Sequence, residues 1–216
     1  MFGKIIFLLL MLVTVSLPVM SKLNIFNIGA FSNSDISGWD QKSFNGETLY
    51  EIENQEGLRF LRAISDMSAS AFYKKVKVDL NNVPYLNWSW KVDKPLKRLN
   101  EQTKAGDDYA ARVYVIARQG LAPWRTKALN YVWSSNAVVG EAWPNAFTDK
   151  AIMIPLRTRS ETGEQWRAEK VNVKKDFKKY FGLEIDEVDG IAIMTDTDNS
   201  KSSITAAYGD LFFSAN

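Results

Sequence analysis

Large apolar residues alternate with polar ones in several short segments, and this period of two is the feature that most constrains the fold. YLNWSWKV places Trp88 and Trp90 on one side of an extended chain, and ALNYVWSS does the same with Tyr131 and Trp133. Successive side chains of a strand point to opposite faces of its sheet. The pattern therefore predicts β-strands that share an aromatic inner face.

Other segments extend this pattern along the chain. FYKKVKVDL, DYAARVYVIA, AIMIPL, GIAIMTD and ITAAYGDLFFS are further predicted strands, and Asn45-Gly46 predicts a hairpin turn because both residues accept positive φ. A single helix is expected over KKDFKKYFG, with Phe177 and Phe181 on one face and Gly182 as its stop. Together these elements predict an all-β antiparallel sandwich with one or two short helices.

Residues 1–21 are typical of a secretory signal peptide. One lysine precedes an apolar run from Ile5 to Val15, and Pro18 and small residues follow it. The run is short for a membrane span of about 20 residues. We expect cleavage between Ser21 and Lys22, which leaves residues 22–216 as one domain in the periplasm or outside the cell, with no stable membrane span. The alternative is an uncleaved anchor.

Cysteine and histidine are both absent from the chain. Their absence excludes disulfides, thiol nucleophiles, a Ser-His-Asp triad and zinc sites built on these residues. A lipoprotein anchor is also excluded, because it needs a cysteine at the cleavage site. The 27 basic and 25 acidic residues are nearly balanced, so nothing in the charge indicates a nucleic-acid partner.

The segment TDTDNS follows a predicted strand with Asp196, Asp198 and Asn199. It begins like an EF-hand loop, but Lys201 and Ala207 occupy the glycine and glutamate positions that such a loop requires. The three residues remain candidate ligands for Ca²⁺ at another kind of site. The alternative is a turn, in which their side chains bond the backbone or form an internal ion pair.

Asp196 and Asp198 could also be a catalytic carboxylate pair. Two residues along a strand span about 6.6 Å, which overlaps the carboxylate separations of glycosidases. Any D-x-D strand shows this spacing, and the nucleophile elbow, the P-loop and the dinucleotide-binding motif are absent. The residues therefore favour a non-catalytic protein over an enzyme.

The segment AGDDYAARVYV places Asp108, Ala110, Arg112 and Tyr114 on one face of a predicted strand, with Tyr109, Ala111, Val113 and Val115 facing the core. Asp108, Arg112 and Tyr114 are candidate ligand-binding residues, with Arg112 as a hydrogen-bond fork. The alternative is an ion pair between Arg112 and an aspartate of a neighbouring strand, such as Asp196.

Two tryptophans lie beside prolines in predicted loops, Trp124 in APWRT and Trp143 in EAWPN. A ring in a loop can stack on the flat apolar face of a sugar, so both are candidate ligand-binding residues. Each ring could equally cap the core.

The segments DDYAARVYV, NYVW, IAIMTDTDNS and AAYGDLFF together resemble the bacterial family catalogued as domain of unknown function 3047, from about Gly38 to Phe213. ISGWD and YGDLFF are also similar to the terminal strands of galactose-binding-like sandwiches. The resemblance implies an exported antiparallel sandwich of the jelly-roll or galactose-binding-like type, and it carries no established activity.

These observations lead to three functional hypotheses. The first is a non-catalytic exported sandwich that binds a carbohydrate or another cell-envelope ligand. The second is a carboxylate-dependent glycan hydrolase or lyase that uses Asp196 and Asp198. The third is a structural or adaptor domain of an envelope protein complex.

Overall fold

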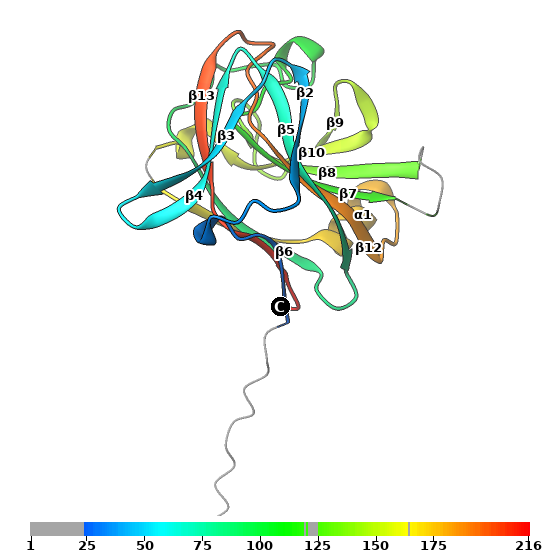
Figure 1. The fold of residues 1–216 in the computed structure, drawn as a ribbon. Helices are drawn as coiled ribbons and strands as arrows, with labels where there is room; N and C mark the ends of the chain where they lie inside the picture. Colours follow the sequence, from blue (N-terminus) through cyan, green and yellow to red (C-terminus); the bar gives the residue numbers. More distant parts are fainter. Residues whose placement is uncertain (1–23, 119, 121–124, 164) are drawn as a thin grey trace, which may run out of the picture.

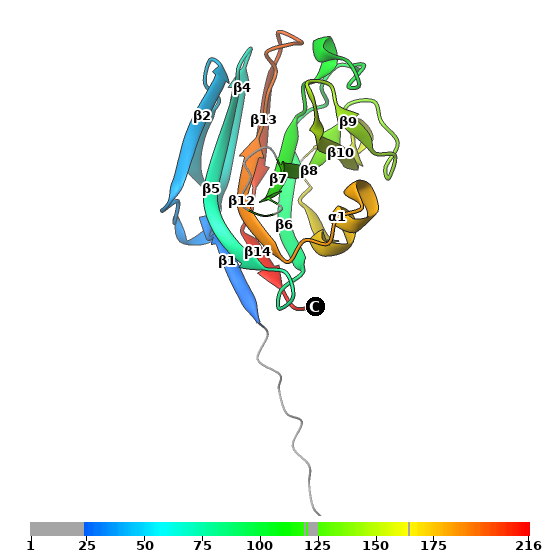
Figure 2. The same ribbon diagram turned by 90° about the vertical axis from the view of Figure 1, so that its right-hand side faces the viewer.

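The structure, a computed structural model, describes residues 24–118, 120, 125–163 and 165–216. The expected signal peptide and Trp124 lie outside these residues. The described chain forms two facing β-sheets (Figures 1 and 2). Strand pairs in both sheets are antiparallel, apart from β8 and β10, which run parallel. The predicted antiparallel β-sandwich is thus confirmed.

Each sheet contains seven of the described strands. In order, the β6 sheet comprises β1 (Ile25–Gly29), β14 (Leu211–Ser214), β6 (Tyr85–Val92), β13 (Ser203–Tyr208), β4 (Leu58–Asp66) and β3 (Leu49–Gln55), and β11 (Arg167–Asn172) also pairs with β6. The β7 sheet comprises β2 (Trp39–Asn45), β5 (Ala69–Asp79), β12 (Glu187–Met194), β7 (Ala111–Arg118), β8 (Thr126–Ser134), β10 (Thr148–Thr158) and β9 (Trp143–Asn145).

Aromatic rings from both sheets meet in the core between them. Trp90 of β6 packs edge-on against Trp88, with ring centroids 5.3 Å apart, and against Trp133 of β8, at 5.7 Å. Trp88 also contacts Tyr131 of β8, at 5.6 Å. All four side chains are buried, as their alternation predicts. Such pairs add about 0.5–1.5 kcal/mol each to the burial of their area.

The Asn45-Gly46 turn does not form the predicted hairpin. Gly46 adopts φ 66°, but β2 pairs with β5 and β3 pairs with β4, so the chain crosses from one sheet to the other here. A local turn motif predicts only that the chain reverses direction. Which strands then pair with each other depends on which of their faces are buried. The predicted strand ITAAYGDLFFS is also two strands, because it breaks at Gly209, whose N–H donates to the Ser89 carbonyl oxygen at 2.8 Å.

The predicted helix is confirmed as α1 (Val173–Phe181). Asn172 caps its first turn by accepting from the Lys175 N–H, and Gly182 ends it at φ 68°. Short 3₁₀ turns lie at η1 (Phe31–Asn33), η2 (Lys104–Gly106) and η4 (Arg159–Glu161). Among the described residues, no helix has both the length and the apolar character that a bilayer crossing requires.

Candidate functional site

Arg112 and Asp196 form a buried ion pair beneath the outer surface of the β7 sheet. The Arg112 Nε donates to Asp196 Oδ1 at 2.7 Å, and its Nη2 contacts Asp196 Oδ2. Nη2 also donates to the Asp107 carbonyl oxygen, Nη1 donates to the Tyr114 hydroxyl, and the guanidinium stacks on the Tyr109 ring. The two charged side chains are 3% and 1% exposed. Arg112 therefore forms an ion pair inside the protein, as the alternative to ligand binding predicts.

Asp108 has a different structural role, because it closes the TDTDNS turn. Its carboxylate accepts from the Asn199 N–H and side-chain amide, each at 3.1 Å, and from the Ser200 N–H at 2.5 Å. Asp198 accepts from the amides of Asn45 and Asn199. The strand face predicted for Tyr109 is wrong, since this buried ring lies on the Arg112 side, where it packs with Trp143 and Met153.

The candidate metal residues lie together, but their oxygens are largely engaged. Carboxylate oxygens of Asp108, Asp196 and Asp198 lie within 4.8 Å of one another. Asp196 faces the Arg112 guanidinium, and Asp108 accepts three N–H donors. Both oxygens of Asp196 therefore contact the guanidinium, and the side chain is 1% exposed. These contacts are those of the alternative, a turn with an internal ion pair, which we favour over a Ca²⁺ site.

Trp143 is buried, and it lines a cavity of about 420 Å³ together with Glu101 and Pro144. Its ring is 7% exposed and packs with Tyr109, Val132 and Met153, so it covers the core. Trp124 lies outside the described residues. Five of the residues singled out in the sequence do line one cavity of about 540 Å³ on the β7 sheet: Arg112, Tyr114, Asp196, Asp198 and Asn199.

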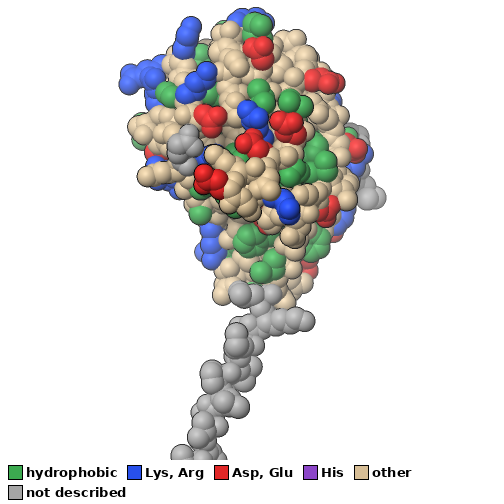
Figure 3. Space-filling view, turned by 60° about the vertical axis from the view of Figure 1, so that its left-hand side comes forward, with side chains coloured by type: hydrophobic (Ala, Val, Ile, Leu, Met, Phe, Trp, Pro, Cys, Tyr) green, Lys and Arg blue, Asp and Glu red, His purple; other side chains and the backbone are tan. Residues whose placement is uncertain are grey.

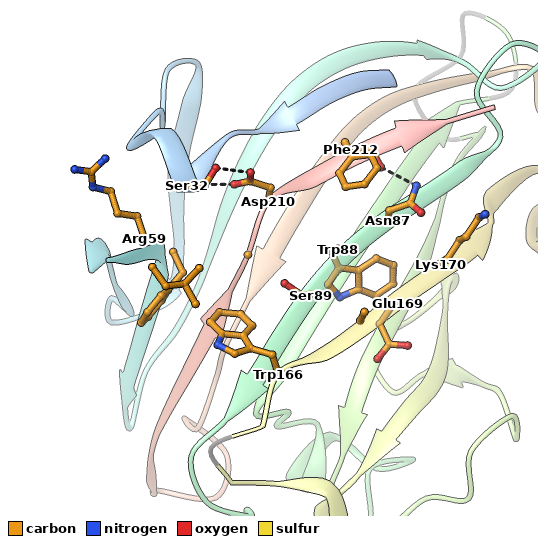
Figure 4. A pocket seen from close by; sticks show the side chains of 14 residues that line it. Ser32, Arg59, Asn87, Trp88, Ser89, Trp166, Glu169, Lys170, Asp210 and Phe212 are labelled. Carbon is orange, nitrogen blue, oxygen red and sulfur yellow. Dashed lines mark hydrogen bonds between the residues drawn. The ribbon is translucent and has the colours of Figure 1, made fainter. Parts of the chain in front are cut away.

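A larger cavity, of about 620 Å³, lies on the outer face of the β6 sheet. We call it the Trp166 groove, and Figure 4 shows it from close by. Its lining includes Trp166, Phe60, Phe212, Asn87, Ser89, Ala168, Glu169, Lys170, Asp210, Arg59 and Ser32. Asn87 and Ser89 reach the outer face because they alternate along β6 with the buried Trp88 and Trp90.

Aromatic rings form the apolar walls of the groove. Trp166 packs edge-on against Phe60, with ring centroids 5.3 Å apart and an interplanar angle of 71°. The Lys91 ammonium lies 5.6 Å from the centroid of Phe60 and 5.7 Å from that of Trp166. Trp166 and Phe212 are half-buried, and Ser89 lies between them in the view of Figure 4. The packed Phe60 thus holds Trp166 at the edge of an open groove.

Polar atoms in the groove divide into engaged and available ones. Glu169 pairs with Arg157, at 2.6 Å, and accepts from the Trp90 indole N–H, while Asp210 accepts from the Ser32 N–H and hydroxyl. Asn87 donates through Nδ2 only. Within the described part of the chain, Asn87 Oδ1, the Ser89 hydroxyl and the Trp166 indole N–H have no hydrogen-bond partner. One acceptor, one hydroxyl and one donor therefore remain for a ligand.

The sequence patterns do not single out the residues of this groove. Trp166 stands outside the alternating segments, and Phe60 and Phe212, which line the groove with it, are 152 residues apart in the sequence. One usable signal was present in YLNWSWKV, where polar Asn87 and Ser89 alternate with buried tryptophans and so mark the outer face of β6.

Comparisons with known proteins agree with this architecture. The family described as "Protein of unknown function (DUF3047)" matches residues 37–212. No curated protein sequence matches the chain significantly. Among solved structures, "Cellulose induced protein, Cip1" has a TM-score of 0.50 at 10% identity, over 84% of this chain and 93% of that one. At this identity, the likeness shows a shared fold.

Two further structures are similar at lower scores. The xyloglucanase domain of NopAA from Sinorhizobium fredii, solved with cellobiose, has a TM-score of 0.46 at 13% identity, over 91% of this chain and 100% of that one. A chain described with promiscuous carbohydrate-binding modules of the β-sandwich superfamily has a TM-score of 0.42 at 12% identity, over 86% of this chain. The present chain spans 59% of the length of that one.

Proposed function

Because the chain belongs to the DUF3047 family, whose description names no activity, we propose a function from the groove itself: the protein binds a carbohydrate chain along the Trp166 groove. The observation that carries this proposal is the set of available polar atoms on Asn87, Ser89 and Trp166, placed between aromatic walls. A sugar presents an apolar C–H face to a ring and hydroxyls to such atoms. The volume of about 620 Å³ is typical of ligand pockets.

The charges around the groove support binding rather than catalysis. Its two acidic side chains are engaged, Glu169 by Arg157 and Asp210 by Ser32. A glycosidase needs one carboxyl group that can donate a proton and a second that acts as nucleophile or base. Figure 3 shows acidic and basic side chains interspersed on the side of the molecule from which the β3–β4 hairpin projects in Figure 1. Recognition would therefore rest on individual groups rather than on a field of one sign.

The expected signal peptide would direct this binding protein to the periplasm or outside the cell, where envelope and environmental glycans are available. We propose that location together with the ligand class.

Titration calorimetry with cellohexaose, mannohexaose and a xyloglucan heptasaccharide tests the proposal. We expect saturable binding to at least one oligosaccharide, reduced at least tenfold by Trp166→Ala. Ala168→Trp should also reduce it, since Ala168 is exposed in the groove and a larger side chain there blocks it without removing a packed ring. Phe26→Ala, on an exposed ring outside the groove, is the matched control. Binding that survives both groove variants would exclude the Trp166 groove.

A further inference from the structure

The cavity of about 540 Å³ on the outer face of the β7 sheet has the same kind of construction as the Trp166 groove. Its floor consists of the buried small or flexible side chains Ala69, Ala151 and Met194. Phe44 and Phe147 also line it, and their side chains are 60% and 58% exposed. Two large apolar rings that remain exposed at one cavity indicate a binding surface more than a structural need.

These two rings are held in place although they are exposed. The Lys42 ammonium lies 5.3 Å from the Phe44 centroid, and the Lys104 ammonium lies 5.4 Å from the Phe147 centroid. Each cation–π contact contributes about 0.5–1 kcal/mol at an exposed site. The Arg112 guanidinium pairs with two of the three carboxylates that line the cavity, those of Asp107 and Asp196, which favours a neutral ligand.

The polar end of the cavity offers both a donor and an acceptor. The Tyr114 hydroxyl accepts from Arg112 Nη1 at 3.1 Å, so its own proton is directed elsewhere. Its other contact is the Met194 sulfur at 3.8 Å, a weak acceptor. Asp198 accepts from two neutral amides, those of Asn45 and Asn199, and retains lone pairs. Apolar rings beside a hydroxyl donor and a carboxylate acceptor fit a sugar.

The cavity and the Trp166 groove lie on opposite faces of the sandwich. Tyr114 and Arg112 alternate along β7 with the buried Val113 and Val115, and Asn87 and Ser89 alternate along β6 with the buried tryptophans. The two outer faces therefore point away from each other, separated by a core about 10 Å thick.

We propose that this cavity is a second carbohydrate site and that one molecule bridges two glycan chains. The inference rests on the proposed carbohydrate binding at the Trp166 groove. It assigns Tyr114 and Asp198 to the ligand's hydroxyls, and Phe44 and Phe147 to its apolar faces. Arg112 is a positioning residue, since it orients the Tyr114 hydroxyl.

A bridging assay tests this second site. Beads that carry immobilised xyloglucan are incubated with the protein and then with fluorescent soluble xyloglucan. We expect the protein to bring the soluble polymer to the beads, and calorimetry to give two heptasaccharides per molecule. Phe44→Ala with Phe147→Ala should abolish bridging and leave one heptasaccharide bound at the groove. Thr148→Trp, an exposed lining position, should do the same by filling the cavity.

The possible outcomes distinguish failure of the second site alone from failure of both proposals. No binding of any panel oligosaccharide overturns both. One heptasaccharide per molecule, with bridging that survives Phe147→Ala and Thr148→Trp, overturns the second site alone, and a doubled mass in light scattering would then identify a dimer as the bridge. Phe26→Ala should change neither readout. Tyr114→Phe should weaken cavity binding severalfold without changing the groove, and equal affinity would contradict the role of its hydroxyl.

Discussion

Arg112 places Nε and Nη2 against both carboxylate oxygens of Asp196, a residue 84 positions away, and this pair joins β7 to the turn that follows β12. Both side chains are buried. Replacing Asp196 with Asn should lower the free energy of unfolding by about 3–5 kcal/mol, because it removes the bidentate partner of a buried guanidinium and leaves only the Asp107 carboxylate, 3.6 Å from Nη1, as a paired charge. Urea denaturation measures this loss. Asp149→Asn, on an exposed side chain, should stay within about 0.5 kcal/mol of the native protein. A similarly small effect at Asp196 would contradict the pairing.

Asp108→Ala should loosen the TDTDNS turn. The substitution removes the acceptor of the Asn199 and Ser200 N–H groups, which are partly buried, so we expect a loss below the cost of about 1–3 kcal/mol for a fully buried unsatisfied donor. We expect faster hydrogen exchange at these two amides, measured by NMR, before any change in the core strands. Asp108→Asn keeps an acceptor oxygen and should exchange at an intermediate rate. Unchanged exchange in the alanine variant would show that the turn needs no cap.

Calcium should not stabilise the protein. The carboxylates of Asp108, Asp196 and Asp198 lie close enough to share an ion, but Asp196 is neutralised by Arg112 and Asp108 is engaged by the turn. A calcium shell takes six to eight oxygen ligands, more than these residues have available. We expect the same melting temperature in calcium and in EDTA by calorimetry. A saturable rise in calcium that Asp198→Asn removes would instead establish the metal site.

Glu101 should make stability depend on pH. Burial raises the pKa of this carboxyl group, although its contacts with Ser134 and Ser135 act in the opposite direction. Because the pKa of Glu101 is higher in the folded protein, the folded protein holds this proton more tightly than the unfolded chain does. Ionisation of Glu101 therefore lowers the stability of the fold as the pH rises above about 4.3, the ordinary pKa of glutamate. The stability of Glu101→Gln relative to that of the native protein should therefore increase as the pH is raised from about 4 to about 7. Urea denaturation at both pH values checks the sign, and a relative loss would contradict it.

The period-two pattern is sufficient to predict the sandwich and its aromatic core, because Trp88 and Trp90, and likewise Tyr131 and Trp133, recur at every second position of a strand and are buried. The Arg112–Asp196 pair was foreseen as one alternative, since a buried charge needs an opposite charge. Asn45-Gly46 was misassigned because turn chemistry is local, whereas the choice of sheet depends on the partners of β2 and β3. The Trp166 groove could not be derived, because its walls come from four strands whose order the pattern leaves open.

The pairing of β1 with β14 also has a mechanical consequence. Ile25 lies opposite Ser214, so the two ends of the described sandwich leave from one point, as Figure 2 shows at the bottom of the molecule. A pulling force applied between these ends would break the hydrogen bonds between β1 and β14 one after another, starting at Ile25 and Ser214. A force transmitted through two bound glycans would instead cross the packed core from face to face. The sandwich should therefore yield more easily to tension between its two chain ends than to tension applied across its two faces.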